Sequence, residues 1–190
     1  MHTFSTWFCE VVPNSLSLQK NWLIMKKKSM LELNRVSCDE YKQAEKLPLV
    51  VILDDVRSLQ NVGSVFRTAD AFLIEKIYLC GITATPPHPD IHKTALGAEE
   101  SVDFEHKESV MEAIDYLRCK GYTICAIEQV HDSVSIEQFI INTGGKYAVI
   151  LGNEVKGVSQ QAVDSSDYCI ELPQYGTKHS LNVSVTAGIV

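Results

Sequence analysis

The sequence contains no apolar run close to the ~18 residues that a membrane-spanning helix requires. Its start lacks the basic segment of a secretory signal peptide. No C-x-x-C pair occurs, and the six cysteines show no spacing typical of a metal site or a disulfide framework. These absences favour a protein of the reducing cytoplasm that has free thiols, no metal and no membrane contact.

An excess of basic residues is also lacking, because 17 Lys and Arg stand against 24 Asp and Glu, for a formal net charge of −7. Proteins that bind polyanions usually lean basic, so a nucleic-acid partner would require the basic side chains to gather on one face. A nucleotide-binding α/β protein of ordinary topology is a further alternative. It would need a phosphate-binding loop, and the sequence contains neither a G-x-G-x-x-G motif nor a Walker loop.

Apolar strands alternate with helices along the chain. Strands are predicted at residues 47–56, 76–81, 122–129, 146–154 and 168–173. Helices are predicted from Asp39 to about Lys46 behind a capping box, from an Asn61 N-cap to residue 73, at 108–121 and in residues 180–190. The pattern predicts an α/β domain with a mainly parallel sheet flanked by helices.

The segments between these elements are interpreted from their composition. The proline-rich residues 82–93 are predicted to be a rigid loop, and residues 130–145 a polar, helix-like segment. We expect residues 1–24 to be an upstream extension, with Met25 as a natural start, and the helix that ends at Val190 to be cut short.

Arg67 stands out on the helix that follows the first strand. The apolar stripe of this helix comprises Val62, Val65, Phe66, Ala69, Phe72 and Leu73. Gly63 lies one turn before Arg67 on the opposite face and is expected to leave room beside the guanidinium. Arg67 is either a surface residue that pairs with Asp70 or part of an anion or ribose-phosphate site.

Two later strands end in glycine turns that carry polar side chains. Gly152 and Glu154 follow one strand, and Ser180 and Asn182 follow the next. Because ligands bind at the carboxyl ends of strands in α/β sheets, these residues are candidates for a site. The alternatives are a tight turn for Gly152 and a helix N-terminal charge for Glu154.

Together these stretches resemble the SpoU-type (TrmH-like) RNA ribose 2′-O-methyltransferases of the SPOUT superfamily. The first motif is N-x-G-x-x-x-R-T at residues 61–68, and the second is L-G-N-E with a later glycine at 151–157. The third is L-P with Gly176 and then S-L-N-V-S-V, within residues 172–185. The resemblance covers about residues 47–190, which we expect to form the methyltransferase domain, with residues 1–46 as an N-terminal extension and short helix.

The resemblance implies a C-terminal deep trefoil knot, a homodimer and S-adenosylmethionine (SAM) as methyl donor, with S-adenosylhomocysteine as product. The knot would hold the cofactor mainly through backbone groups of three loops. The residues that the resemblance assigns to cofactor binding are Ala126, Ile127, Glu128, Leu151, Gly152, Ile170, Leu172, Gly176 and Leu181.

By the same resemblance, Asn61, Arg67, Glu154, Ser180 and Asn182 would form the catalytic pocket of an enzyme that methylates a ribose 2′-hydroxyl of tRNA or rRNA. Arg67 is the family's usual candidate for the base. An arginine with a pKa above ~12 is a poor proton acceptor, so we assign Arg67 to gripping a phosphate or stabilising the developing alkoxide. Phosphate, water or Glu154 would then take the proton.

Some features depart from the family pattern. We expect the segment before residue 47 to be too short for a separate RNA-binding domain, and the net charge is acidic. His88, His92 and Lys93 in the proline-rich loop are candidates for RNA contact, and the histidine spacings fit no zinc pattern. The alternative function is a non-catalytic RNA-binding or ribosome-assembly module that retains the same fold.

Overall fold

The computed structural model describes residues 26–29, 32–33 and 36–190. The chain divides into two units, Met1–Arg35 and Val36–Val190. In the described part of the first unit, the Glu32 carboxylate accepts a 2.6 Å hydrogen bond from the backbone N–H of Ser29. The expected extension at residues 1–24 lies outside the described residues.

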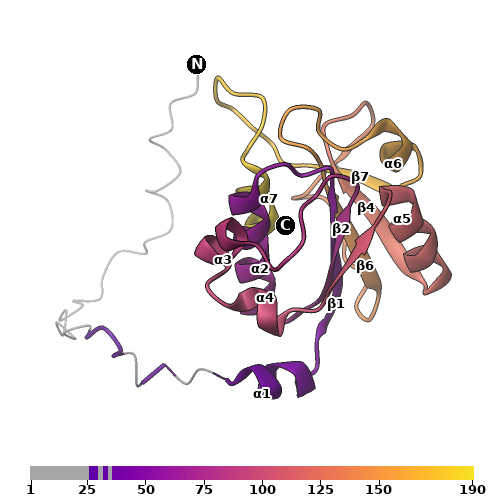
Figure 1. Cartoon of the computed structure of the whole chain (residues 1–190). Coiled ribbons are helices and arrows are strands. Elements are labelled where there is room, and N and C mark those ends of the chain that lie inside the picture. The colour runs from indigo at the N-terminus through magenta and orange to yellow at the C-terminus, as the bar shows by residue number, and fades with distance from the viewer. Residues whose placement is uncertain (1–25, 30–31, 34–35) are drawn as a thin grey trace, which may run out of the picture. The chain divides into compact units, whose positions relative to one another are not determined.

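The second unit is built on a seven-stranded sheet in the order β3-β2-β1-β6-β4-β7-β5, and its paired strands are all parallel (Figure 1). The predicted α/β class and mainly parallel sheet are therefore confirmed. The strands are β1 (Leu47–Asp54), β2 (Ile74–Cys80), β3 (Phe104–Lys107), β4 (Tyr122–Ile127), β5 (Val134–Ser135), β6 (Lys146–Leu151) and β7 (Tyr168–Glu171). The helices are α1 (Cys38–Gln43), α2 (Leu59–Ala71), α3 (Pro89–Ala95), α4 (Ala98–Ser101), α5 (Val110–Cys119), α6 (Gln160–Asp164) and α7 (Val183–Ile189).

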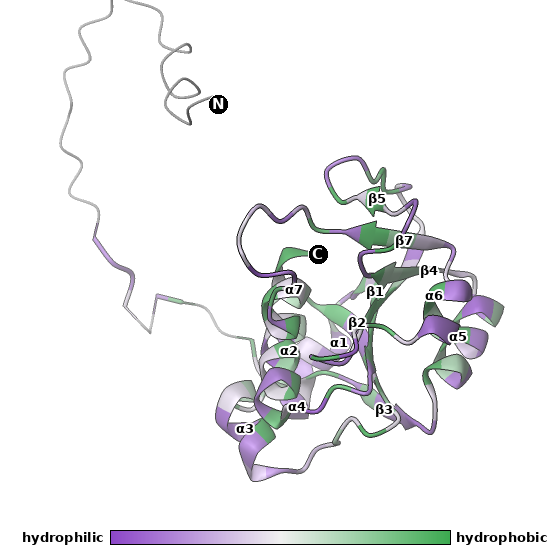
Figure 2. Cartoon of the chain, turned by 90° about the horizontal axis from the view of Figure 1, so that it is seen from above, coloured by the Kyte–Doolittle hydropathy of each residue, from purple (hydrophilic) through white to green (hydrophobic). Residues whose placement is uncertain are grey.

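Helices cover both faces of this sheet. Figure 2 shows α2, α3, α4 and α7 on one side and α5 with α6 on the other. Successive residues of β1 divide between the two cores: Val51 and Leu53 pack toward α2, whereas Val50 and Ile52 pack toward α5. This burial on both faces explains why the strand is apolar throughout rather than alternating.

Helix α1 forms where the capping-box sequence predicted a helix. Ser37 is its N-cap and forms the expected capping box, because the Ser37 hydroxyl accepts from the Glu40 N–H while the Glu40 carboxylate accepts from the Ser37 N–H. The helix ends at Gln43, three residues before the predicted end, where Ala44 takes an extended conformation.

Two predictions between these elements are wrong, and one strand was not predicted. Residues 130–145 contain the two-residue strand β5 and turns rather than a helix-like segment. The four-residue strand β3 gave no recognisable pattern. Helix α3 begins at Pro89, inside the predicted rigid loop, because proline fits the first helical position, where its missing N–H has no intrahelical partner anyway.

The start of α2 also differs from the prediction. Its N-cap is Ser58, whose hydroxyl accepts from the Asn61 N–H at 3.3 Å, so Asn61 lies within the first turn and its amide is available for other contacts. At the other end the helix stops at Ala71, and Phe72 leaves the apolar stripe and is 61% exposed.

Gly63 does not leave room beside the Arg67 guanidinium, as the sequence analysis expected, but contacts helix α3. A Cβ at this position would lie 2.2 Å from the Thr94 hydroxyl oxygen and 2.3 Å from the Ile91 carbonyl oxygen, both on α3. Gly63 itself is buried. The missing side chain therefore allows α3 to pack against α2 and does not make room for Arg67.

Replacing Gly63 with alanine is expected to destabilise the fold by about 1–3 kcal/mol, because the added methyl group must push α3 away from α2. Urea denaturation measures the change. Gly188→Ala is the matched control, since Gly188 lies in α7 with nothing within 4 Å of the position that a Cβ would take, and alanine favours helix. Equal stability of Gly63→Ala and the wild type would contradict this account of the packing.

Candidate active site

The carboxyl ends of β1, β4, β6 and β7 meet at one edge of the sheet, because these neighbouring strands are parallel. A cleft of about 530 Å³ opens there between the loops that follow β4, β6 and β7. Its volume is within the range of small-molecule sites. The predicted site residues that line it are Ile127, Glu128, Leu151, Gly152, Glu154, Ile170, Leu172, Ser180, Leu181 and Asn182.

Glu154 joins the loop after β6 to the start of α2. Its Oε1 accepts from the Ser58 N–H at 3.0 Å and from the Asn61 side-chain amide at 2.9 Å, and its Oε2 accepts from the Arg57 N–H at 3.0 Å. Partial burial alone raises the pKa of Glu154, but these hydrogen bonds outweigh burial and lower the pKa below its usual value. A carboxylate with both oxygens engaged and a lowered pKa is a weak proton acceptor.

Replacing Glu154 with glutamine is expected to make the protein less stable near neutral pH, with a difference from the wild type that shrinks in acid. The lowered pKa means that the ionised carboxylate stabilises the fold above the ordinary carboxyl pKa, and this contribution disappears as the pH falls through the lowered value. Denaturation curves between about pH 7 and about pH 3 measure it. Glu171→Gln is the control, and a Glu154→Gln deficit independent of pH would contradict the assignment.

Asn61 and Asn182 connect α2 to α7. The Asn182 amide donates to the Asn61 side-chain oxygen at 3.0 Å, and Asn61 in turn donates to Glu154. The Asn182 oxygen caps α7 by accepting from the Ser184 N–H at 2.8 Å. One chain of hydrogen bonds therefore links the first, second and third motifs, although these residues are far apart in the sequence.

The glycine turn after β6 is closed by Asn153. Its side-chain oxygen accepts from the Val155 and Lys156 N–H groups, and its amide donates to the Asp55 carbonyl at the end of β1. Asn153 and Gly157 also exchange backbone hydrogen bonds of 3.0 and 2.9 Å. The turn is thereby folded back on itself and attached to the neighbouring strand.

Arg67 does not line the cleft of the same chain. It is exposed on α2 and lines a shallow surface pocket together with Ser64, Thr68 and Lys93. Among the described residues no hydrogen bond or ion pair engages its guanidinium, and Asp70 instead accepts from the Ser101 hydroxyl at 2.5 Å. The structure therefore brings Asn61, Glu154, Ser180 and Asn182 together and leaves Arg67 outside this group.

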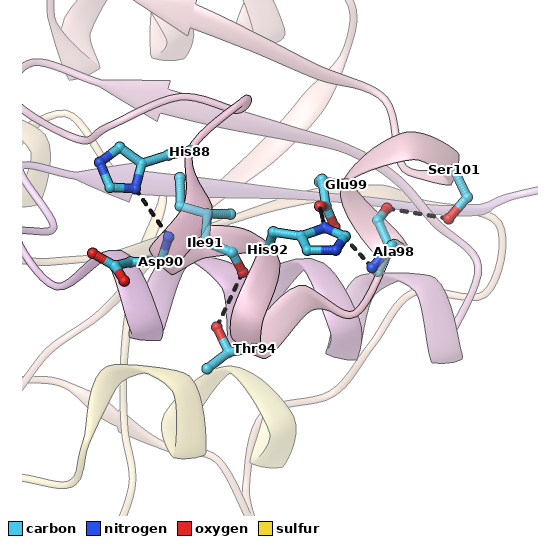
Figure 3. Close-up of polar contacts among 9 residues, drawn as sticks. His88, Asp90, Ile91, His92, Thr94, Ala98, Glu99 and Ser101 are labelled. Atoms are coloured by element: carbon cyan, nitrogen blue, oxygen red, sulfur yellow. Dashed lines mark hydrogen bonds and ion pairs between the residues drawn. The ribbon is translucent and has the colours of Figure 1, made fainter.

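The histidines predicted to contact RNA have structural partners in α3 and α4. His88 is the N-cap of α3, and its Nδ1 accepts from the Asp90 N–H at 3.1 Å. His92 Nδ1 lies 2.5 Å from Glu99 Oε1 (Figure 3). The hydrogen bond to Glu99 raises the pKa of His92. Both imidazoles also line a separate surface pocket with Pro86, Pro87 and Phe104.

Two residues assigned to cofactor binding lie apart from the cleft lining. Ala126 is fully buried within β4, and Gly176 is exposed in the loop after β7. Ten further residues line the cleft, although the sequence analysis did not assign them to the site. Asn153, Gly157 and Val183 belong to the second and third motifs, whereas nothing in the local pattern distinguishes Gln129, Val155, Lys156, Glu171, Gln174, His179 and Thr186.

Negative charge dominates the cleft. The carboxylates of Glu128, Glu154 and Glu171 line it, against one lysine, Lys156, and His179. This balance favours a ligand that carries positive charge over a polyphosphate. In the described part of the chain, no group of histidine, cysteine and carboxylate side chains has the arrangement of a metal site. No described helix has the length and apolar character needed to cross a membrane.

Comparisons with known proteins identify the family of this chain. The model of the SpoU rRNA methylase family matches residues 48–190. The 23S rRNA (guanosine-2′-O-)-methyltransferase RlmB of Coxiella burnetii is 32% identical over 78% of this chain and 58% of its own length. The tRNA (guanosine(18)-2′-O)-methyltransferase of Borreliella burgdorferi is 28% identical over 75% of this chain and 63% of its own.

Solved structures show the same fold. The A. aeolicus TrmH/SpoU tRNA modifying enzyme aligns with a TM-score of 0.69 at 26% identity, over 80% of this chain and 75% of that one. An AdoMet-bound rRNA methyltransferase from Sinorhizobium meliloti aligns with a TM-score of 0.70 at 24% identity, over 78% and 57% of the two chains. The present chain spans 58–65% of the length of three of the curated relatives that it matches. The family model covers all of β4, β6 and β7 and all but the first residue of β1, the four strands at the cleft. This chain therefore belongs to the SpoU rRNA methylase family.

Proposed function

We propose that this protein transfers the methyl group of SAM to a ribose 2′-hydroxyl of tRNA or rRNA. The observation that carries the proposal is the hydrogen-bonded chain Asn182–Asn61–Glu154, which joins all three family motifs at the edge of one cleft. Family membership and the names of two relatives, an rRNA and a tRNA 2′-O-methyltransferase, support the reaction and the substrate class.

The cleft fits SAM in size and in charge. Its volume is about 530 Å³, and the apolar side chains of Ile127, Leu151 and Leu172 line it beside three carboxylates. SAM supplies an electrophilic methyl group on a positively charged sulfonium, which a surplus of carboxylates favours electrostatically. Solved AdoMet-bound relatives of the same fold are consistent with this choice.

The polar residues at the cleft edge would orient the ribose. Asn61 and Asn182 are held by each other and by Glu154, so their amides are fixed before substrate arrives. Ser180 is exposed and lines the same cleft as Asn182. Orientation of this kind contributes ~7–11 kcal/mol in favourable cases, and it is the main catalytic contribution that we assign to the protein.

Glu154 is a positioning residue in this mechanism, because its oxygens are already occupied and its pKa is lowered. The 2′-hydroxyl proton would instead pass to water or to a phosphate of the RNA. Arg67 would grip that phosphate or stabilise the developing alkoxide, with Lys93 in the same surface pocket adding positive charge for the RNA backbone.

Arg67 does not line the cleft of its own chain. In a homodimer, we propose, Arg67 of one copy lies at the cleft of the other copy. Phe72, directly after α2, and Val185 and Ile189 on α7 are large exposed apolar side chains at two helices of the same layer, which supports a covered interface there. We extend the proposal to a cytoplasmic enzyme, in keeping with the free thiols of Cys80 and Cys125.

The proposal includes the C-terminal trefoil knot of the SPOUT fold. It is supported by the contacts of the segment after β7, where Gln129 donates to the His179 carbonyl and Asn182 donates to Asn61. This segment thus passes beside the loop after β4 before α7 packs in the α2 layer. The methyltransferase domain would comprise residues 47–190.

Incubation of the protein with isotope-labelled SAM and total tRNA or ribosomal RNA tests the function. Nuclease digestion and mass spectrometry are expected to find label in 2′-O-methylated nucleosides. Label confined to bases would contradict the proposed reaction. RNA binding without any transfer, and without binding of SAM, would favour the non-catalytic module.

A further inference from the structure

Glu128 follows β4 directly and uses both carboxylate oxygens on backbone groups. Its Oε2 accepts from the Val158 N–H at 2.9 Å, across the cleft wall formed by the loop after β6. Its Oε1 accepts from the Gln129 N–H at 2.9 Å. The Glu128 N–H itself donates to the Ile170 carbonyl of β7 at 3.1 Å. Glu128 thus joins the segment after β4 to two others around the cleft, β7 and the loop after β6.

The Glu128 carboxylate packs directly against Gly157 in the loop after β6, with no space for a side chain at that position. Gly157 has a φ of +71°, and a Cβ there would lie 2.1 Å from Glu128 Oε2. On the far side of the same turn, a Cβ at Gly152 would lie 2.1 Å from the Val158 nitrogen and from the Gly157 carbonyl carbon. Gly152, the turn at Gly157 and the Glu128 carboxylate are therefore stacked in direct contact.

Gln129 reaches in the other direction. Its side-chain amide donates to the His179 carbonyl at 3.1 Å, in the loop that precedes Ser180 and Asn182. Adjacent side chains from one strand end thus hold the second-motif loop and the third-motif loop. The motifs that indicated the family contain neither residue.

We propose that Glu128 and Gln129 form a clamp that assembles the cofactor cleft before the cofactor binds. This inference rests on the proposed function for its ligand, since it makes both side chains positioning residues for SAM. Loops that are already held in place need no ordering on binding, so affinity is gained without a direct contact to the ligand. Loss of the clamp would weaken SAM binding and leave the chemical step largely intact.

Two measurements on the full chain test the clamp, with Glu128→Ala and Gln129→Ala as variants. Calorimetry with SAM is expected to show a Kd raised roughly tenfold to a hundredfold in Glu128→Ala, as for a lost hydrogen bond to a charged group, while kcat at saturating SAM changes little. Amide hydrogen exchange of the ligand-free protein is expected to accelerate at residues 152–158 in Glu128→Ala and at 176–182 in Gln129→Ala. Glu128→Gln retains one acceptor oxygen but loses the charge, so its affinity for SAM is expected to lie between those of the wild type and Glu128→Ala.

Matched controls for hydrogen exchange are Glu171→Ala and Gln174→Ala, which line the same cleft but form no side-chain hydrogen bond within the described residues. They are expected to leave exchange of both loops unchanged. Unchanged exchange in Glu128→Ala and Gln129→Ala, or a uniform acceleration across the whole sheet, would overturn the clamp. Failure of the wild type to bind SAM would overturn the proposed function, and hydrogen exchange would still decide the clamp.

Discussion

Replacing Arg67 with alanine is expected to reduce methyl transfer by about 10²–10³-fold while leaving the Kd for SAM unchanged. The reason is that Arg67 lies outside the cleft of its own chain and has no partner among the described residues, and the proposed mechanism gives it contact with the RNA rather than with SAM. Single-turnover kinetics with saturating RNA and calorimetry with SAM measure the two quantities. Arg118→Ala, on α5 in the opposite helix layer, is the control arginine.

A lysine at position 67 separates two roles for the arginine. Recovery of most of the activity in Arg67→Lys would mean that a positive charge suffices, whereas continued loss would mean that the planar, bidentate guanidinium is required. A parallel fall in SAM affinity in Arg67→Ala would contradict its place outside the cofactor site. Activity within twofold of the wild type would contradict any catalytic role.

Replacing Gly152 with alanine is expected to weaken SAM binding by at least about a hundredfold and to lower stability by about 1–3 kcal/mol. The new methyl group would lie 2.1 Å from backbone atoms of Gly157 and Val158, which no side-chain rotation relieves, so the whole second-motif turn must move. Calorimetry and urea denaturation measure the two effects. Gly176→Ala is the matched control, because nothing lies within 4 Å of its Cβ position. Normal SAM affinity in Gly152→Ala would show that this turn does not form the cofactor site.

The same two variants locate Arg67 relative to the cleft. If each cleft of a homodimer uses Arg67 of the second copy, a mixture of Arg67→Ala and Gly152→Ala subunits contains clefts with neither defect, and about a quarter of wild-type activity should return. If each chain uses its own Arg67, the mixture stays inactive.

Elements set by local chemistry were predicted well from the sequence. The Ser37–Glu40 capping box is a contact between residues three apart, and the continuous apolar run of β1 follows from cover on both faces. Asn61 was misplaced as an N-cap because Ser58, three residues earlier, offers an equivalent side chain and the helix takes the earlier start. Strand β5 has only two residues, too few to carry a period. Strand β3 is as short as the predicted β7, but its sequence F-E-H-K is mostly polar and none of its residues is buried, so it lacks an apolar run.

In the candidate site too, features that depend on neighbouring residues were predicted, and features that depend on residues far apart in the sequence were not. The glycine turns and their polar residues were predicted, and the structure gathers Asn61, Glu154 and Asn182. Gly63 packs against the carbonyl group of Ile91 in α3, nearly thirty residues further along the chain. The sequence around Gly63 therefore could not predict that the glycine is needed for helix packing. The side chains of Glu128 and Gln129 likewise act on loops about 30 and 50 residues further on.

A crystal structure of the full chain with S-adenosylhomocysteine tests the central claim most directly. We expect the ligand between the loops after β4, β6 and β7, in contact with Leu151, Ile170 and Leu172, with its sulfur facing the edge formed by Asn61 and Asn182. Binding at any other surface, or an empty cleft at saturating ligand, would contradict the assignment of this cleft as the methyl-transfer site.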